Sequence, residues 1–183
     1  MKLLRTLMTS ALLFALPALC PAAEAYSDDE VMKAASDFFA TGAKDLGTVL
    51  QKVLKEKGQP MAFIRGEEAA GAVGVGLRYG HGELVYKGGG GQKVYWQSPS
   101  IGFDIGGNAA KVFTLVYNLP SSQKLFQRFP GVDGSLYFVG GFGVNYVQSG
   151  KISLAPVRLG VGWRQGVNVG YMKFTEQRRI NPF

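Results

Sequence analysis

The chain has 183 residues, of which 20 are basic and 13 acidic, so its net charge is +7. With 46% hydrophobic residues it has the composition of a globular domain rather than of a disordered chain. One cysteine and one histidine exclude a disulfide framework and a zinc site built from several such ligands. We therefore expect neither a metal nor a cofactor.

The first 25 residues have the pattern of an export signal. Lys2 and Arg5 give it a positive start. Residues 7–19 form an apolar stretch that is too short to span a bilayer, and the Ala-Glu-Ala that follows fits a cleavage site. We expect cleavage after Ala25, which leaves residues 26–183 as one periplasmic domain without a transmembrane span.

Cleavage also sets the expected charge and partners of the exported domain. It removes two basic residues, one acidic residue and Cys20, and so lowers the net charge from +7 to +6. Excess positive charge favours anionic partners. Because export separates the protein from nucleic acid, we expect a cell-envelope component as partner: an anionic lipid, a glycan or an envelope protein.

The next segment predicts one amphipathic helix over about residues 28–57. Ser27 and Glu30 have the spacing of a capping box, and the sequence Gly-Gln-Pro ends the helix. Gly42 and Gly47 weaken its middle and are compatible with a break there. Its apolar residues recur at helical spacing on one stripe: Val31, Ala34, Phe38, Leu46, Val49, Leu50 and Val53.

From Met61 onward, apolar residues recur with a period of two, which is typical of strands. Glycine, proline, asparagine and serine separate many short segments of this kind. The segment SSQKLFQRF, residues 121–129, is the one other candidate helix, and it is short. Many short strands after one helix predict a mainly β fold, either an antiparallel barrel or a sandwich.

The segment GVGLRYGHGELVY, residues 74–86, raises the question of whether its glycines mark a phosphate-binding loop or a strand. The loop needs a third glycine where Tyr79 stands, and a helix after it, so its pattern fails. We interpret the segment as a strand with one bulky apolar face and one glycine-rich face that carries occasional arginine, aspartate or asparagine. The same alternation recurs at residues 101–106, 142–147, 157–164 and 167–172.

Two arrangements agree with this alternation. The bulky residues fill a small soluble barrel, with the helix over part of the glycine-rich face, or they face lipid in an outer-membrane barrel. The amphipathic helix, the charged end EQRRINPF and the adjacent Glu67 and Glu68 favour the soluble form. The outer-membrane barrel remains the alternative. In the soluble form, four bulky residues are expected in the core: Val75, Leu77, Val161 and Trp163.

Seven stretches follow one another along most of the chain: GEEAAGA, GLRYGHGELVYK, KVYWQSPSIGFDIGG, LVYNLP, QRFPGVDGS, LAPVRLGVGWRQGVNVGY and the terminal NPF. In this order they resemble the alphaproteobacterial envelope-integrity A family. The resemblance implies a soluble periplasmic protein, folded as a small closed antiparallel barrel of about eight strands, with no established enzymatic activity. YGHGELVY, LVYN and GVDGS are also similar to SYLF lipid-binding domains, which implies binding of anionic lipid head groups.

Charged residues on the glycine-rich register are the candidate ligand contacts. Because glycine leaves little bulk around them, arginine forks there are open to anionic lipid or glycan groups. The opposing interpretation is that these arginines pair with Asp104 to neutralise charge inside the fold. The candidate ligand-binding residues are Arg78, Asp104, Arg158 and Arg164.

Catalytic groups are scarce in this sequence. His81 lies between two glycines, which predicts a solvated turn, and no serine stands in a G-x-S-x-G elbow. Glu67 and Glu68 are adjacent, so on a strand they point to opposite faces and do not act as a pair. A glycan hydrolase that uses either of them with Asp104 is the second alternative. We expect no catalytic residues, and a non-catalytic periplasmic protein that supports envelope integrity.

Overall fold

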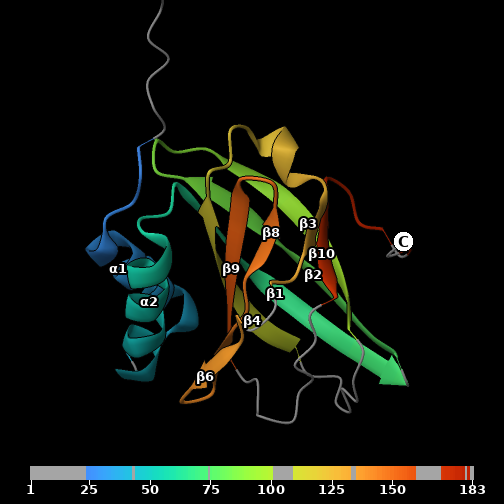
Figure 1. The fold of residues 1–183 in the computed structure, drawn as a ribbon, viewed down its shortest axis with the longest axis horizontal. Coiled ribbons are helices and arrows are strands. Elements are labelled where there is room, and N and C mark those ends of the chain that lie inside the picture. The colour runs from blue at the N-terminus through green and yellow to red at the C-terminus, as the bar shows by residue number, and fades with distance from the viewer. Residues whose placement is uncertain are drawn as a thin grey trace, which may run out of the picture.

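A computed structural model of the chain describes residues 24–42, 44–73, 75–100, 109–132, 135–159, 170–179 and 181. In this part of the chain, two helices pack on one side of a curled antiparallel sheet, so the fold is mainly β, as expected (Figure 1). The helical elements are α1 (Asp28–Phe39), α2 (Lys44–Lys57) and a short 3-10 helix at Ser122–Leu125. The strands are β1 (Ala62–Val73), β2 (Val75–Tyr86), β3 (Gly91–Ser100), β4 (Ala109–Tyr117), β5 (Arg128–Pro130), β6 (Tyr137–Val139), β7 (Phe142–Val144), β8 (Val147–Ser149), β9 (Ile152–Leu159) and β10 (Tyr171–Thr175).

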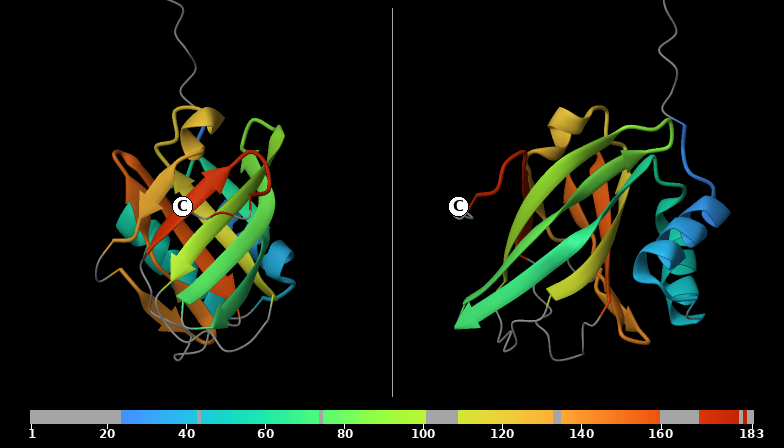
Figure 2. Two further views of the ribbon diagram at one scale, coloured as in Figure 1. Left: turned by 90° about the vertical axis from the view of Figure 1, so that its right-hand side faces the viewer. Right: turned by 180° about the vertical axis from the view of Figure 1, so that it is seen from behind.

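The segment expected to form one helix forms two. The capping box is present, because Glu30 N donates to Ser27 Oγ at 3.3 Å and Ser27 N donates to the Glu30 carboxylate at 2.7 Å. The chain leaves the helix at Ala40, whose φ of 54° is left-handed. A single helix over residues 28–57 would be about 45 Å long. The break instead folds α2 back beside α1, so that both lie on the same sheet face (Figure 2).

Among the described residues, the sheet holds ten strands in the order β5-β10-β3-β2-β1-β4-β9-β7-β6, with β8 also paired to β9. β7 and β8 lie along the same edge of β9, separated by Asn145 and Tyr146, so a segment expected as one strand is split in two. Among the described residues one isolated bridge, Gly131 to Val147, links the end of β5 to β8. The sheet is thus a curled half-barrel (Figure 2), and closure into eight strands stays a prediction.

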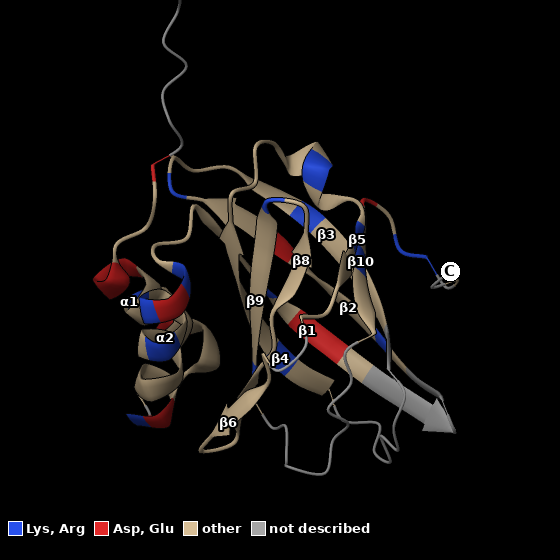
Figure 3. Ribbon diagram, viewed as in Figure 1, with Lys and Arg blue, Asp and Glu red and all other residues tan. Residues whose placement is uncertain are grey.

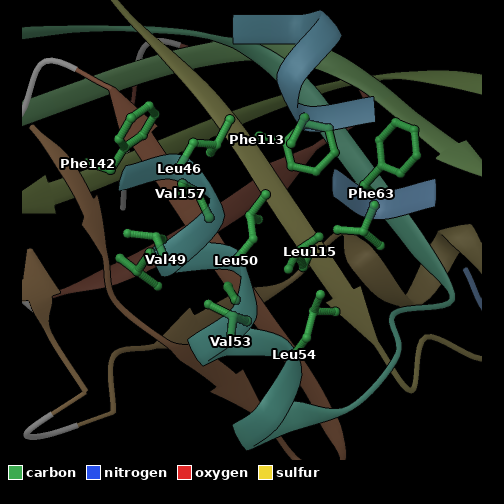
Figure 4. Packing of buried hydrophobic residues seen from close by; sticks show 14 of the residues in the cluster. Leu46, Val49, Leu50, Val53, Leu54, Phe63, Phe113, Leu115, Phe142 and Val157 are labelled. Atoms are coloured by element: carbon green, nitrogen blue, oxygen red, sulfur yellow. The ribbon is translucent and has the colours of Figure 1, made fainter. Parts of the chain in front are cut away.

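The sheet has an apolar layer on each side. The outer layer lies between the sheet and the helices, where Leu50 and Val53 of α2 meet Phe63, Phe113 and others (Figure 4). The inner layer fills the concave side of the sheet. It includes Ile64, Leu84, Val94, Trp96, Val112, Leu154, Phe129, Met172 and Phe174. Neighbouring strand residues such as Phe63 and Ile64 therefore belong to opposite layers.

The glycine-rich register faces the inside of the sheet, and this corrects the expectation that the helix covers it. A Cβ at Gly80 would clash with the indole of Trp96, and one at Gly66 would lie 2.8 Å from the same ring. Glycine is needed here because a large indole lies directly on the backbone of two neighbouring strands. The helices cover the bulky register instead.

The four bulky residues expected in the core have different outcomes. Leu77 is half-buried and, among the described residues, belongs to neither apolar layer, so the prediction of a core position was wrong for it. The side chain of Val75 and the whole of Val161 and Trp163 lie outside the described residues. No helix among the described residues is long and apolar enough to cross a membrane.

Candidate functional site

A buried charged cluster lies on the inner face of the sheet, next to the glycines. Glu68 projects from β1 and Arg158 from β9, and they are 4% and 5% exposed. Arg158 Nε donates to Glu68 Oε1 at 2.6 Å, and Trp96 Nε1 donates to Glu68 Oε2 at 3.2 Å. Arg158 Nη1 also donates to the side-chain oxygen of Asn145 at 2.6 Å. Both oxygens of the carboxylate are thereby engaged.

The split between β7 and β8 has a role in this cluster. Asn145 lies in the gap between these two short strands, and its amide oxygen reaches the guanidinium that projects from β9. The indole of Trp96 reaches Glu68 because Gly66 and Gly80 leave room for the ring. The irregular strand and the glycines therefore both serve to position partners for one ion pair.

The surroundings of Glu68 keep it ionised. Burial raises its pKa, but the charges of Arg158 and Arg78 and the hydrogen bonds from Arg158 and Trp96 outweigh burial and hold the pKa below its ordinary value of 4.5. A carboxyl group that serves as a general acid needs the opposite, a raised pKa. The geometry is therefore that of a satisfied buried ion pair.

The structure brings two of the four predicted ligand-binding residues together. Arg78 and Arg158 are both buried and both act on the charge of Glu68. Asp104 and Arg164 lie outside the described residues. As ligand contacts, all four stay predictions, but Arg158 takes Glu68 as its partner, a pairing that sequence reasoning missed. The only local signal was that Glu68 stands two residues after Gly66 and so shares the glycine-rich face of its own strand.

The other candidate chemical groups lie apart from the cluster. Glu67 is exposed on the outer face of β1, opposite to Glu68, as adjacent strand residues predict. His81 is exposed but lies within β2, so the expected turn was wrong. Within the described ranges, no group of three histidine, cysteine or acidic residues could hold a metal ion. Figure 3 shows the acidic stretch of β1 and the basic segment that follows β10.

The fold and the cluster define a class: a β-barrel-like sheet with a helix pair outside and an ion pair inside. Residues 24–183 match the family model described as Envelope integrity protein A, and the chain belongs to this family. The chain is also similar to a solved structure, a β-barrel-like, uncharacterized protein from Brucella abortus, with 40% identity and a TM-score of 0.78. That match covers 87% of this chain and 99% of the other.

A comparison with curated proteins finds no match. Membership of the family confirms the resemblance seen in the sequence, and it indicates a role in, and a location at, the cell envelope.

Proposed function

We propose that this protein is a non-catalytic periplasmic protein that supports envelope integrity by binding an anionic envelope component. The family supports the envelope role. The absence of catalysis is supported mainly by Glu68. Both of its carboxylate oxygens accept hydrogen bonds, from Arg158 and Trp96, and its pKa is lowered. Binding of an anion is supported by the excess of basic residues, 20 against 13.

Two alternative functions fit less well. A glycan hydrolase needs two carboxyl groups across one substrate, and one of them must be a proton donor. Glu68 lacks the raised pKa and Glu67 lies on the other face of the sheet, which argues against this reading. An outer-membrane barrel would present its bulky face to lipid. Here α1 and α2 cover the part of that face that holds Phe63 and Phe113, which supports a periplasmic form.

The test uses protein purified from the periplasm of cells that express the full chain. Its binding is measured to anionic and zwitterionic vesicles and to acidic and neutral polysaccharides, and each polysaccharide is assayed for new reducing ends. We expect binding to at least one anionic material, weaker or absent binding to the neutral ones, and no hydrolysis. Equal, negligible binding to every material would remove the ligand from the proposal, and glycan turnover would overturn its non-catalytic part.

A further inference from the structure

The outer face of β1, β2 and β3 carries a groove that, at one end, also reaches Glu68 and Trp96 of the buried cluster. Two adjoining hollows, of about 420 and about 660 Å³, share Glu67, His81 and Tyr95. Phe38 of α1 bounds the larger hollow, and Arg178 and Arg179, in the segment after β10, bound the smaller one. The right-hand view of Figure 2 shows these green strands between the helices and the C-terminal segment.

The register of the three strands builds the floor of the groove as rows of outward side chains. Glu67 pairs with His81, and His81 pairs with Tyr95, so these three form the middle row. Such cross-strand neighbours lie about 5 Å apart. The row toward α1 is Arg65, Glu83 and Lys93, and the row toward the C-terminal segment is Ala69, Tyr79 and Gln97.

Gln97, on the floor of the smaller hollow, bonds to the C-terminal segment that bounds this hollow, and its side-chain oxygen is left without a donor among the described residues. Its Nε2 donates to the carbonyl oxygen of Arg179 at 3.0 Å, which holds the C-terminal segment across β3. Gln97 is 1% exposed, and its Oε1 has no hydrogen-bond partner within the described part of the chain. A buried acceptor is stabilised when a donor reaches it. A ligand hydroxyl that enters this hollow would supply that donor.

The charged and aromatic side chains that line the groove indicate what kind of ligand it could bind. Four basic and three acidic residues line the groove. Two of the acidic ones are already paired, Glu83 with Arg65 at 2.9 Å and Glu68 with Arg158 at 2.6 Å. In the described part of the chain, no hydrogen bond or ion pair engages the side chains of Glu67, His81 or Arg178. The groove thus offers cationic forks, a free acceptor and the half-exposed ring of Tyr95.

We propose that this groove binds a segment of an acidic polysaccharide. Sugar hydroxyls need donors and acceptors side by side, pyranose faces pack on aromatic rings, and carboxylate or phosphate substituents suit arginine forks. A chain of sugars fits two hollows joined end to end, whereas a flat membrane surface does not follow a concave floor that holds a carboxylate. The inference rests on the proposed function, which leaves the class of anionic ligand and its binding site open.

The test measures affinity of the periplasm-purified protein for a heparin hexasaccharide, an oligogalacturonide and a neutral maltohexaose by calorimetry. The variants are Tyr95→Ala and the double variant Arg178→Ser, Arg179→Ser. A matched control, Lys55→Ser with Lys151→Ser, removes the same charge from exposed positions outside the groove. We expect both groove variants to lose affinity for an acidic saccharide by about tenfold or more. The control should stay within about twofold of the wild type.

The outcomes separate this inference from the proposed function. If the wild type binds an acidic saccharide and the groove variants bind as tightly as the control, the groove is the wrong site, while the proposed function stands. If it binds anionic vesicles but neither acidic saccharide, the ligand class is wrong and an anionic lipid takes its place. If it binds no anionic material at all, both fail. Circular dichroism of each variant shows that a lost affinity is not lost folding.

Discussion

At the scale of single residues, the fold depends on Glu68 having a cation beside it. A carboxylate inside a protein is stable only when charges and hydrogen bonds replace its water. Arg158 supplies both, and its charge is the first of the effects that oppose the cost of burial at Glu68. The ion pair of Arg65 and Glu83 has a similar distance of 2.9 Å, but both of its side chains are exposed, so their charges remain hydrated.

The variant Arg158→Ala is therefore expected to destabilise the protein by about 3–5 kcal/mol, because it leaves Glu68 buried without its main partner. The matched variant Arg65→Ala breaks an exposed ion pair and should cost below about 1 kcal/mol. Urea denaturation followed by tryptophan fluorescence measures both free energies. Equal small losses in the two variants would show that the interior of the sheet admits water to Glu68.

A second residue-scale prediction concerns the glycines under Trp96. Gly80→Ala should destabilise the protein by about 1–3 kcal/mol, because the new methyl group clashes with the indole and forces it to move. Gly88→Ala, at a position where a Cβ meets nothing within 4 Å, should change stability by less than about 0.5 kcal/mol. Thermal unfolding of both variants gives the comparison. If Gly80→Ala is as stable as Gly88→Ala, glycine at position 80 serves another purpose.

At the scale of elements, the sequence patterns predicted which segments form helices and strands. They did not predict which face of the sheet packs against the helices. The capping box of α1 and the strand character of β1 to β4 follow from local patterns, and the structure has them. The period of two assigns alternate residues to alternate faces but is the same whichever face lies inside. Phe63 and Ile64 are both buried, on opposite sides, so the strand pattern could not say where the helices pack.

The helix pair gives the element-scale prediction. Leu50→Ala in α2 should destabilise the protein by about 2–5 kcal/mol, because Leu50 is fully buried between the helix and the sheet. Leu77→Ala should cost clearly less, since Leu77 is half-buried and outside both apolar layers. Denaturant midpoints of the two variants test this order. The reverse order would mean that the outer face of β2 is covered in solution and that α2 packs loosely.

The candidate site was less predictable than the fold. Arg78 and Arg158 were found from their register among glycines, but the carboxylate that joins them comes from a strand 90 residues before Arg158. A single sequence gives no information on which distant strands become neighbours. The outer groove depends on the same information, because Glu67, His81 and Tyr95 become one row only through the register of three strands.

At the scale of the whole molecule, the chain beside the predicted cleavage point is already tied to the domain. Tyr26 N donates to the carbonyl oxygen of Pro60 at 2.8 Å, and the ring of Tyr26 lies 5.0 Å from that of Phe63. Intact-mass analysis of protein from the periplasm should give a chain that begins at Tyr26, so that this docked residue is kept in the mature protein. A mass that includes a lipid-modified Cys20 would contradict the predicted cleavage after Ala25.

A helix-covered sheet, a buried ion pair and an excess of positive charge occur together in a protein of an envelope family. None of these features requires turnover of a substrate. If the protein works by holding an anionic component, electrostatic attraction must contribute to its affinity, and salt must weaken that attraction.

The most direct measurement is the affinity of the periplasm-purified protein for acidic envelope polysaccharide from about 0.01 M to about 0.5 M salt, where screening becomes strong. The account predicts measurable binding at low salt that falls steadily as salt rises, and no change in the length of the polysaccharide. Affinity that does not depend on salt, or shortening of the polysaccharide chain, would contradict it.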